Sequence, residues 1–311
     1  MPAGQSSDVA AQWIAAMRSG DHDAAWAVSD KVLAARDPAT RDDERLPYHR
    51  RWVWDGSPLV GREVLVRCYH GLGDTIQFVR FVPLLARIAA VVVVEAQPCL
   101  VPLLEASNLG ARFMPFAPTR PRPPRARCIE MMELSHALRL SPGAAKPPYL
   151  CVVQQEIDAQ RARFAGARPT AALCWRAGGW DRERSLALDA LAACLPRSWQ
   201  LLQLQLDASA EERCAAPFLN PEDRLARILD TGGLIASADL VVTTDTMVAH
   251  LAGALGRPGM VLLKHEADWR WETGARSSWY PTLRLFRQTR RGDWHGVLRA
   301  LTAALERWPA D

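Results

Sequence analysis

The stretch "VVTTDTMVAHLAGALGRPGMVLL", Val241–Leu263, has the pattern of a strand, a helix and a second strand. A short apolar run ends in the polar residues Thr243–Thr246, an alanine-rich segment follows, and another apolar run begins at Gly259. Both runs are short and almost wholly apolar, which is typical of parallel strands that helices cover on both faces. This stretch therefore predicts an α/β fold.

The same alternation extends over most of the chain. Apolar runs typical of strands lie at 63–69, 90–96, 111–116, 170–176, 199–206, 239–245 and 259–263. Helical patterns lie at 70–88, 99–107, 185–195, 246–256 and 293–308, a proline- and arginine-rich loop at 117–128, and a polar loop leading into a helix at 221–230. We therefore expect two Rossmann-like, doubly wound domains that face each other across a cleft, with ligands at the carboxyl ends of the strands.

The N-terminal part has a different pattern. Residues 8–35 carry apolar positions at helical spacing on either side of Gly20 and Asp21, which predicts two amphipathic helices. Together they resemble one helical hairpin of a tetratricopeptide-type repeat. The expected division is a hairpin at 1–45, two Rossmann-like domains at 46–150 and 151–285, and a C-terminal helix at 286–311.

Composition excludes several classes of protein. The 311 residues carry a net charge of +4 and are 49% hydrophobic, which indicates a globular protein and gives no reason to expect a nucleic-acid partner. Seven dispersed cysteines without a CxxC pair indicate buried free thiols in a reducing compartment, with no metal site. No apolar run could span a bilayer, and the N-terminus lacks a secretory signal, so we expect a cytoplasmic protein.

The first candidate site is the polar end of the quoted strand. Asp245 could cap the following helix, whose free N–H groups attract anions, and His250 returns to the same helix face as Thr246 one turn later. Threonines beside an imidazole suit a sugar or phosphate ligand. The alternative is a plain helix cap and a histidine satisfied within the core.

The second candidate is "CYHGLGDTIQF", residues 68–78. Gly71 and Gly73 would let a ligand approach the helix N-terminus, and Asp74 could act as a general base on a hydroxyl. The dinucleotide fingerprint GxGxxG is absent because Ile76 occupies its last position. The alternative is that Asp74 only caps the helix.

The third candidate is "CWRAGGWDRERSLAL", residues 174–188, which follows another strand. Arginine at such a loop could bind a diphosphate with two N–H groups, and Lys264 at a further strand end could offset its charge. The alternative is a solvated charged loop. Aromatic residues at 265–288 could stack on a sugar or base, but such residues more often serve packing.

Four motifs in this order resemble one family. They are "RWVWDGSPLVGREVLVRCYHGLGDTIQFVRFVPLLA", "WRAGGWDRERSLAL", "ADLVVTTDTMVAHLAGALGRP" and "DWRWETG" with the segments that follow it. They look like the glycosyltransferase domain of bacterial tetratricopeptide-repeat proteins, which is similar to the lipopolysaccharide heptosyltransferases. The resemblance covers roughly residues 50–305 and implies a GT-B fold, with an N-terminal acceptor domain and a C-terminal nucleotide-sugar domain. It also implies that the last helix, at 286–311, packs back on the first domain.

The resemblance also implies residue roles. Asp74 matches the candidate base of these inverting, metal-independent enzymes, whose Asp-Thr-x-x-x-His motif matches Asp245, Thr246 and His250. Their phosphate-binding basic residue falls near Arg184. The full set of expected donor-binding residues is Gly71, Gly73, Arg176, Arg184, Ser185, Thr244, Asp245, Thr246, Met247, His250 and Lys264.

These roles imply transfer of a hexosyl or heptosyl group from a nucleotide-sugar, with an ADP-heptose-like donor among the candidates, to a protein or glycan hydroxyl by direct displacement, without a cofactor. Asp74 would take the hydroxyl proton, and Arg184, Lys264 and the helix N-terminus at Thr246 would stabilise the departing diphosphate. Arg176 and Lys264 depart from the family pattern. They keep open a catalytically inactive module that binds a nucleotide-sugar or a partner protein, and an epimerase is a third possibility. A homo-oligomer is also possible.

Overall fold

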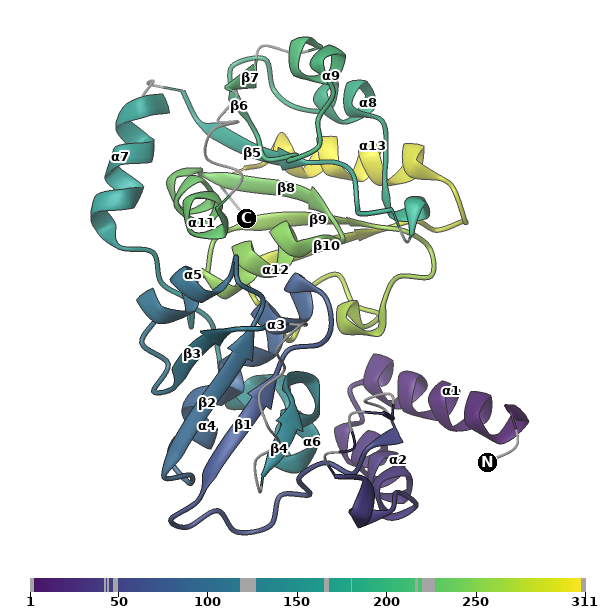
Figure 1. Ribbon diagram of the computed structural model, residues 1–311. Coiled ribbons are helices and arrows are strands. Elements are labelled where there is room, and N and C mark those ends of the chain that lie inside the picture. The colour runs from purple at the N-terminus through teal and green to yellow at the C-terminus, as the bar shows by residue number, and fades with distance from the viewer. Residues whose placement is uncertain are drawn as a thin grey trace. The chain divides into compact units, whose positions relative to one another are not determined.

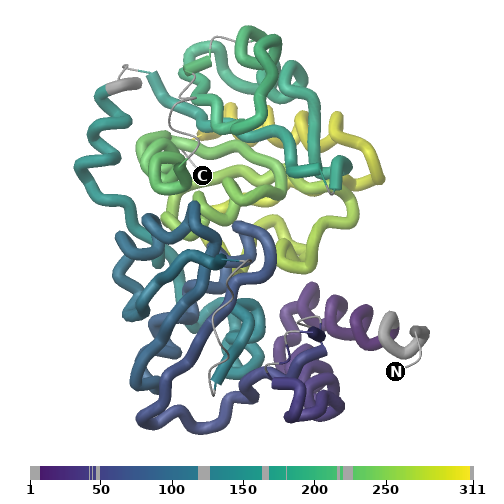
Figure 2. The backbone as a smooth tube through the Cα atoms, viewed as in Figure 1, coloured from purple at the N-terminus to yellow at the C-terminus, as the bar shows by residue number. Residues whose placement is uncertain are grey.

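The structure is a computed structural model that describes residues 3–41, 43, 45–46, 50–117, 127–164, 168–179, 181–215, 218–219 and 227–308. Most of the loop expected at 117–128, and most of the segment expected at 221–230, lie outside these residues. The chain forms two compact units (Figures 1 and 2). Unit 1 comprises Met1–Lys146 and Asp268–Thr273, and unit 2 comprises Pro147–Ala267 and Gly274–Asp311.

Among the described residues, unit 1 contains a four-stranded parallel sheet in the order β3-β2-β1-β4. Its strands are β1 Glu63–Arg67, β2 Val91–Ala96, β3 Arg112–Pro115 and β4 Cys128–Glu130. The helices between and after them are α3 Leu72–Phe78, α4 Val82–Leu85, α5 Val101–Ala106 and α6 Leu134–Ala137, with a 3-10 turn η4 at Met131–Glu133. The apolar runs expected to form strands do so because their side chains are buried.

The two N-terminal helices are α1 Ala3–Ser19 and α2 His22–Ala34 (Figure 1). Trp13 donates its ring N–H to Ser29 at 3.1 Å, and its ring meets that of Trp269 edge-on with centroids 5.0 Å apart. Asp30 on α2 pairs with His136 at 2.9 Å. Both helices are thus fastened to the rest of unit 1, while their tetratricopeptide-like character stays a prediction.

Unit 2 contains a six-stranded parallel sheet among its described residues, in the order β10-β9-β8-β5-β6-β7. Its strands are β5 Thr170–Cys174, β6 Gln200–Gln203, β7 Phe218–Leu219, β8 Leu240–Thr244, β9 Gly259–Leu263 and β10 Leu283–Arg287. Counted from the β7 edge, the order β7-β6-β5-β8-β9-β10 is the strand order of the Rossmann fold. The topological switch point, where ligands bind in such sheets, therefore lies between β5 and β8.

Helices cover both faces of this sheet (Figure 1). They include α8 Leu188–Ala192, α9 Ala210–Cys214, α11 Ile228–Ser237, α12 Met247–Ala254 and α13 Trp294–Leu305, while α7 Gln154–Phe164 packs against α11. The segment 286–311 was expected to pack back on the first domain, but the apolar face of α13 lies in the core of unit 2. The reason is that Val297, Leu301 and Leu305 recur at helical spacing and meet apolar residues of the second sheet. The other expected domain boundaries stay predictions.

The cysteines differ in part from the expectation. All are free thiols, but Cys99, Cys151 and Cys214 are exposed rather than buried. In the part of the chain that the structure describes, no helix combines the length and the apolar character needed to cross a bilayer.

Candidate functional site

The β8–α12 junction in unit 2 holds the first group of expected residues. Thr246, and not Asp245, is the N-cap of α12, because its Oγ1 accepts a hydrogen bond from Val248 N at 3.3 Å. Thr246 Oγ1 also lies 3.1 Å from Thr243 Oγ1. Asp245 is buried, and a buried carboxylate needs a hydrogen-bonding or charged partner. Because Thr246 caps the helix, this partner comes from another part of the chain.

That partner is Arg184, which belongs to the 3-10 turn η6 Arg182–Arg184 in the loop after β5. Its Nη1 donates to Asp245 O at 3.0 Å and lies 3.6 Å from Asp245 Oδ2. The contact joins the loop after β5 to the end of β8, so it spans the switch point of the sheet. Both side chains are largely removed from solvent, which strengthens their electrostatic interaction.

Asp181 connects this pair to Lys264. Asp181 Oδ2 lies 3.5 Å from Arg184 Nε and 3.0 Å from Lys264 Nζ. Lys264 follows β9, so residues after β5, β8 and β9 meet at one edge of the sheet. The arrangement places Arg184 beside the residue that precedes the N-cap of α12 and links it through Asp181 to Lys264. An anion at a helix N-terminus is stabilised by the helix dipole.

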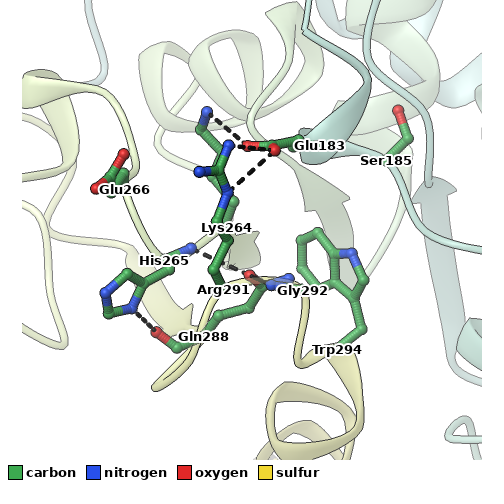
Figure 3. Close-up of a pocket in the computed structure, with 9 residues that line it drawn as sticks. All are labelled: Glu183, Ser185, Lys264, His265, Glu266, Gln288, Arg291, Gly292 and Trp294. Carbon is green, nitrogen blue, oxygen red and sulfur yellow. Dashed lines mark hydrogen bonds and ion pairs between the residues drawn. The ribbon is translucent and has the colours of Figure 1, made fainter.

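Beyond Lys264 the loops enclose a cavity of about 120 Å³ (Figure 3). Glu183 contacts both Arg291, with Oε1 2.6 Å from Nη2, and Lys264, with Oε2 3.6 Å from Nζ. The hydrogen bond from Arg291 holds the pKa of Glu183 below its usual value. The cavity is lined by Glu183, Ser185, Lys264, His265, Glu266, Gln288, Arg291, Gly292 and Trp294.

Three further expected residues surround the junction. Met247 is the first residue of α12, and the hydroxyl of Thr244 is buried without a hydrogen-bond partner among the described residues. His250 is buried one turn into α12, and its Nδ1 lies 3.0 Å from Tyr280 Oη. Gly253 makes room for the Tyr280 ring on the next turn. His250 is therefore held in place by a hydrogen bond from the core.

The remaining loop residues have local partners. Ser185 Oγ accepts a hydrogen bond from Ala177 N at 3.1 Å, which closes the loop. Arg176 Nη1 lies 2.6 Å from Glu212 Oε1, and Arg176 Nη2 donates to Asp207 O at 2.7 Å. The hydrogen bond with Glu212 raises the pKa of Arg176. Arg176 thus fastens the loop to α9, whereas Arg184 reaches the β8–α12 junction.

The glycine turn of unit 1 holds the second group. Gly71 is the N-cap of α3, Gly73 lies in its first turn, and Asp74 Oδ2 accepts from Gly71 N at 2.9 Å. Asp74 Oδ1 lies 2.5 Å from Arg270 Nη2. Asp74 therefore takes part in the helix cap from the third position of α3, with Gly71 as the N-cap, and also forms an ion pair.

Arg270 is the centre of a small cluster in unit 1. Its Nη1 lies 2.8 Å from Asp268 Oδ1, and its guanidinium carbon lies 4.3 Å from the centroid of the Trp269 ring. The aromatic residues Trp271, Trp279 and Tyr280 are buried, which supports the packing role expected for this segment.

Glu130 is a chemically notable residue that the sequence analysis missed. It ends β4, is 1% exposed, and accepts a hydrogen bond from Met132 N at 2.7 Å. Burial raises its pKa to about 8. An acidic residue at the end of an apolar strand was the available signal, since β4 reads "CIE". No group of three or more His, Cys, Asp or Glu side chains among the described residues could hold a metal ion.

No protein-family model matches the chain, and no curated protein matches it. Three solved structures are similar to it. The ADP-heptose lipopolysaccharide heptosyltransferase II of E. coli is 14% identical, with 78% of this chain and 99% of that chain covered and a TM-score of 0.54. A glycosyl transferase family 9 protein from Veillonella parvula is 8% identical, with 78% and 96% covered and a TM-score of 0.58.

The third is the iron-containing dodecameric glycosyltransferase TibC from enterotoxigenic E. coli. It is 11% identical, with 76% of this chain and 66% of that chain covered and a TM-score of 0.52. At these identities the similarities show that the chain shares the fold of these glycosyltransferases.

Proposed function

We propose that this protein is a glycosyltransferase that moves a sugar from a nucleotide-sugar, ADP-heptose or a similar donor, to a hydroxyl of a protein or glycan. The contact between Arg184 and Asp245 across the switch point carries this inference, because it places a cation beside a helix N-terminus where doubly wound sheets bind ligands. The fold shared with heptosyltransferase II supports it.

In unit 2, the donor diphosphate would bind at the N-terminus of α12. The first backbone N–H groups of a helix lack intrahelical partners and can donate to a phosphate, and the planar guanidinium of Arg184 can present two N–H groups to one phosphate. Lys264, whose Nζ forms an ion pair with Asp181, would offset the remaining negative charge of the diphosphate. These groups stabilise the diphosphate most as it gains charge on leaving, which is when stabilisation accelerates the reaction.

In unit 1, Asp74 would act as the general base. The acceptor oxygen attacks the anomeric carbon while Asp74 takes its proton, and the bond from that carbon to the diphosphate oxygen breaks. The nucleoside diphosphate leaves with the bonding electrons, and the configuration at the anomeric carbon inverts. Asp74 already has Arg270 and Gly71 N as partners, which orient the carboxylate toward a single geometry.

Incubation with a panel of nucleotide-sugars and candidate acceptors tests the function. We expect acceptor-dependent release of a nucleoside diphosphate, matched by a glycosylated acceptor of inverted anomeric configuration, with undiminished rate in chelator-treated buffer. Release into water alone would indicate a hydrolase, and an isomerised sugar would indicate an epimerase. Binding of a donor with no turnover for any acceptor would contradict the enzyme and leave a binding module.

A further inference from the structure

The cavity beside Lys264 has features that the proposed donor site does not use (Figure 3). Its walls come from the loops that follow β5, β9 and β10, all at the carboxyl edge of the second sheet. Its volume of about 120 Å³ is several times the ~10–15 Å³ that a cavity needs to hold one water molecule. The cavity therefore has room for several oxygens of a phosphate-type anion.

Gln288 brings a buried amide to this cavity. The side chain is 3% exposed, and its Oε1 accepts hydrogen bonds from His265 N at 3.2 Å and Gly292 N at 2.9 Å. These two donors fix the orientation of the amide, because the reverse orientation would set N–H groups against each other. Nε2 is buried without a hydrogen-bond acceptor among the described residues. A ligand oxygen would satisfy this donor.

Glu183 occupies the position that an anionic ligand would take. Its carboxylate bridges Arg291 and Lys264, and Figure 3 shows both cations directed at it. Yet the side chain is 51% exposed and that of Arg291 is 71% exposed. Exposed ion pairs of this kind contribute little to stability, so an anion with more charge and more oxygens can displace the carboxylate.

We propose that this cavity is a subsite for a phosphate-type anion, which Lys264, Arg291 and Gln288 Nε2 bind in place of the Glu183 carboxylate. The subsite adjoins the proposed donor site through Lys264 and Ser185. The anion is either the diphosphate of the donor, an assignment that rests on the proposed function, or a separate phosphate or pyrophosphate ion.

Calorimetric titration of inorganic pyrophosphate into the full chain, at constant ionic strength, tests the subsite without any sugar transfer. We expect saturable binding to one site. Glu183→Gln removes the competing carboxylate and should tighten binding about fivefold. Asp189→Asn is the matched control, because it removes a carboxylate from an exposed position on α8 that does not line the cavity. It should change the dissociation constant less than about twofold.

Arg291 is tested in the same way. Arg291→Gln should weaken pyrophosphate binding about tenfold or more, because it removes a cation that can bind two oxygens. Arg290→Gln removes the same charge from the adjacent exposed residue, which does not line the cavity, and should have little effect. Equal weakening by both variants would show a general charge effect and overturn the subsite.

Titration of a nucleoside diphosphate separates the two sources of the anion. If Arg291→Gln weakens it as much as pyrophosphate, the subsite takes the donor diphosphate. If only pyrophosphate is affected, the subsite takes a separate ion. Absence of saturable pyrophosphate binding in both the wild type and Glu183→Gln would overturn the inference. Failure of glycosyl transfer would leave pyrophosphate binding intact, so the two failures are distinguishable.

Discussion

Arg270 Nη2 lies 2.5 Å from Asp74 Oδ1, although 196 residues separate them in the chain. The contact lies within unit 1, because the segment Asp268–Thr273 joins that unit while the residues on either side of it belong to unit 2. Asp74 therefore has two structural roles, in the helix cap and in the ion pair, beside its proposed role as a base. Both stability and turnover must be measured for each Asp74 variant to separate the structural roles from the catalytic one.

Asp74→Asn should lower turnover about 10²–10⁴-fold, because an amide cannot accept the acceptor proton. The amide oxygen can still accept from Gly71 N, but the ion pair with Arg270 is lost, so some loss of stability is expected. The donor dissociation constant should change little, because the proposed donor site lies in unit 2. Steady-state kinetics measure turnover, calorimetry with the donor measures its dissociation constant, and thermal melting measures stability. Asp268→Asn is the control, since it takes a carboxylate from the same arginine. Unchanged turnover in Asp74→Asn would leave Asp74 with a structural role only.

Arg184→Gln should weaken donor binding about tenfold or more, because a charge-assisted contact to phosphate is lost. It should also destabilise the protein by about 1–3 kcal/mol, since buried Asp245 loses hydrogen bonding and compensating charge. Calorimetry below the melting range measures the affinity. Arg182→Gln, an exposed residue in the same turn, should leave it unchanged. Donor affinity that falls equally in both variants would speak against the assigned phosphate contact.

Glu130 predicts a specific dependence of stability on pH. Its pKa rises from 4.5 to about 8 on folding, so the native state binds more protons than the unfolded state between these values. Stability should therefore fall as pH rises through this window. Glu130→Gln carries no titratable group at this position. Its free energy of unfolding should exceed that of the wild type by an amount that grows as pH rises and reaches at most about 5 kcal/mol above pH 8. Melting temperatures of both proteins at pH 5, 7 and 9 measure this. Parallel profiles would show that Glu130 ionises normally.

Gly253→Ala should destabilise unit 2 by about 1–3 kcal/mol through overpacking. A Cβ at this position would overlap the ring of Tyr280, which would have to move and lose its hydrogen bond with His250. Gly178→Ala is the control, because no atom lies within 4 Å of its added Cβ. Thermal melting compares the two. Equal melting temperatures would mean that the Tyr280 ring repacks without cost.

The sequence predicted most elements of both sheets because parallel strands buried on both faces carry short apolar runs. It missed α7, whose sequence "QQEIDAQRARF" is largely polar, and β10, where "LRLFR" alternates charged and apolar residues. It also missed the short elements α9 and β7. Helix α13 was predicted, but its packing partner was not, because amphipathic spacing shows that a face is buried and not which sheet buries it.

The sequence could predict only those features of the candidate site that depend on residues close together in the chain. The cap at Thr246 lies within one strand–helix junction, yet Asp245 was the residue expected to form it. The local sequence also did not show that Arg184 and Arg176 have different partners. Only the fold brings Arg184 to Asp245 and Arg176 to Glu212. The Asp74–Arg270 contact depends on segments far apart in the chain and leaves no local pattern.

Hydrogen exchange of the full chain with and without a bound nucleotide-sugar tests the central claim most directly, because it locates the donor on the protein. The account predicts slower exchange of backbone amides at 245–250, where α12 begins, and at 181–185, the loop that carries Arg184. Donor binding that slows exchange elsewhere, with both segments unchanged, would contradict it.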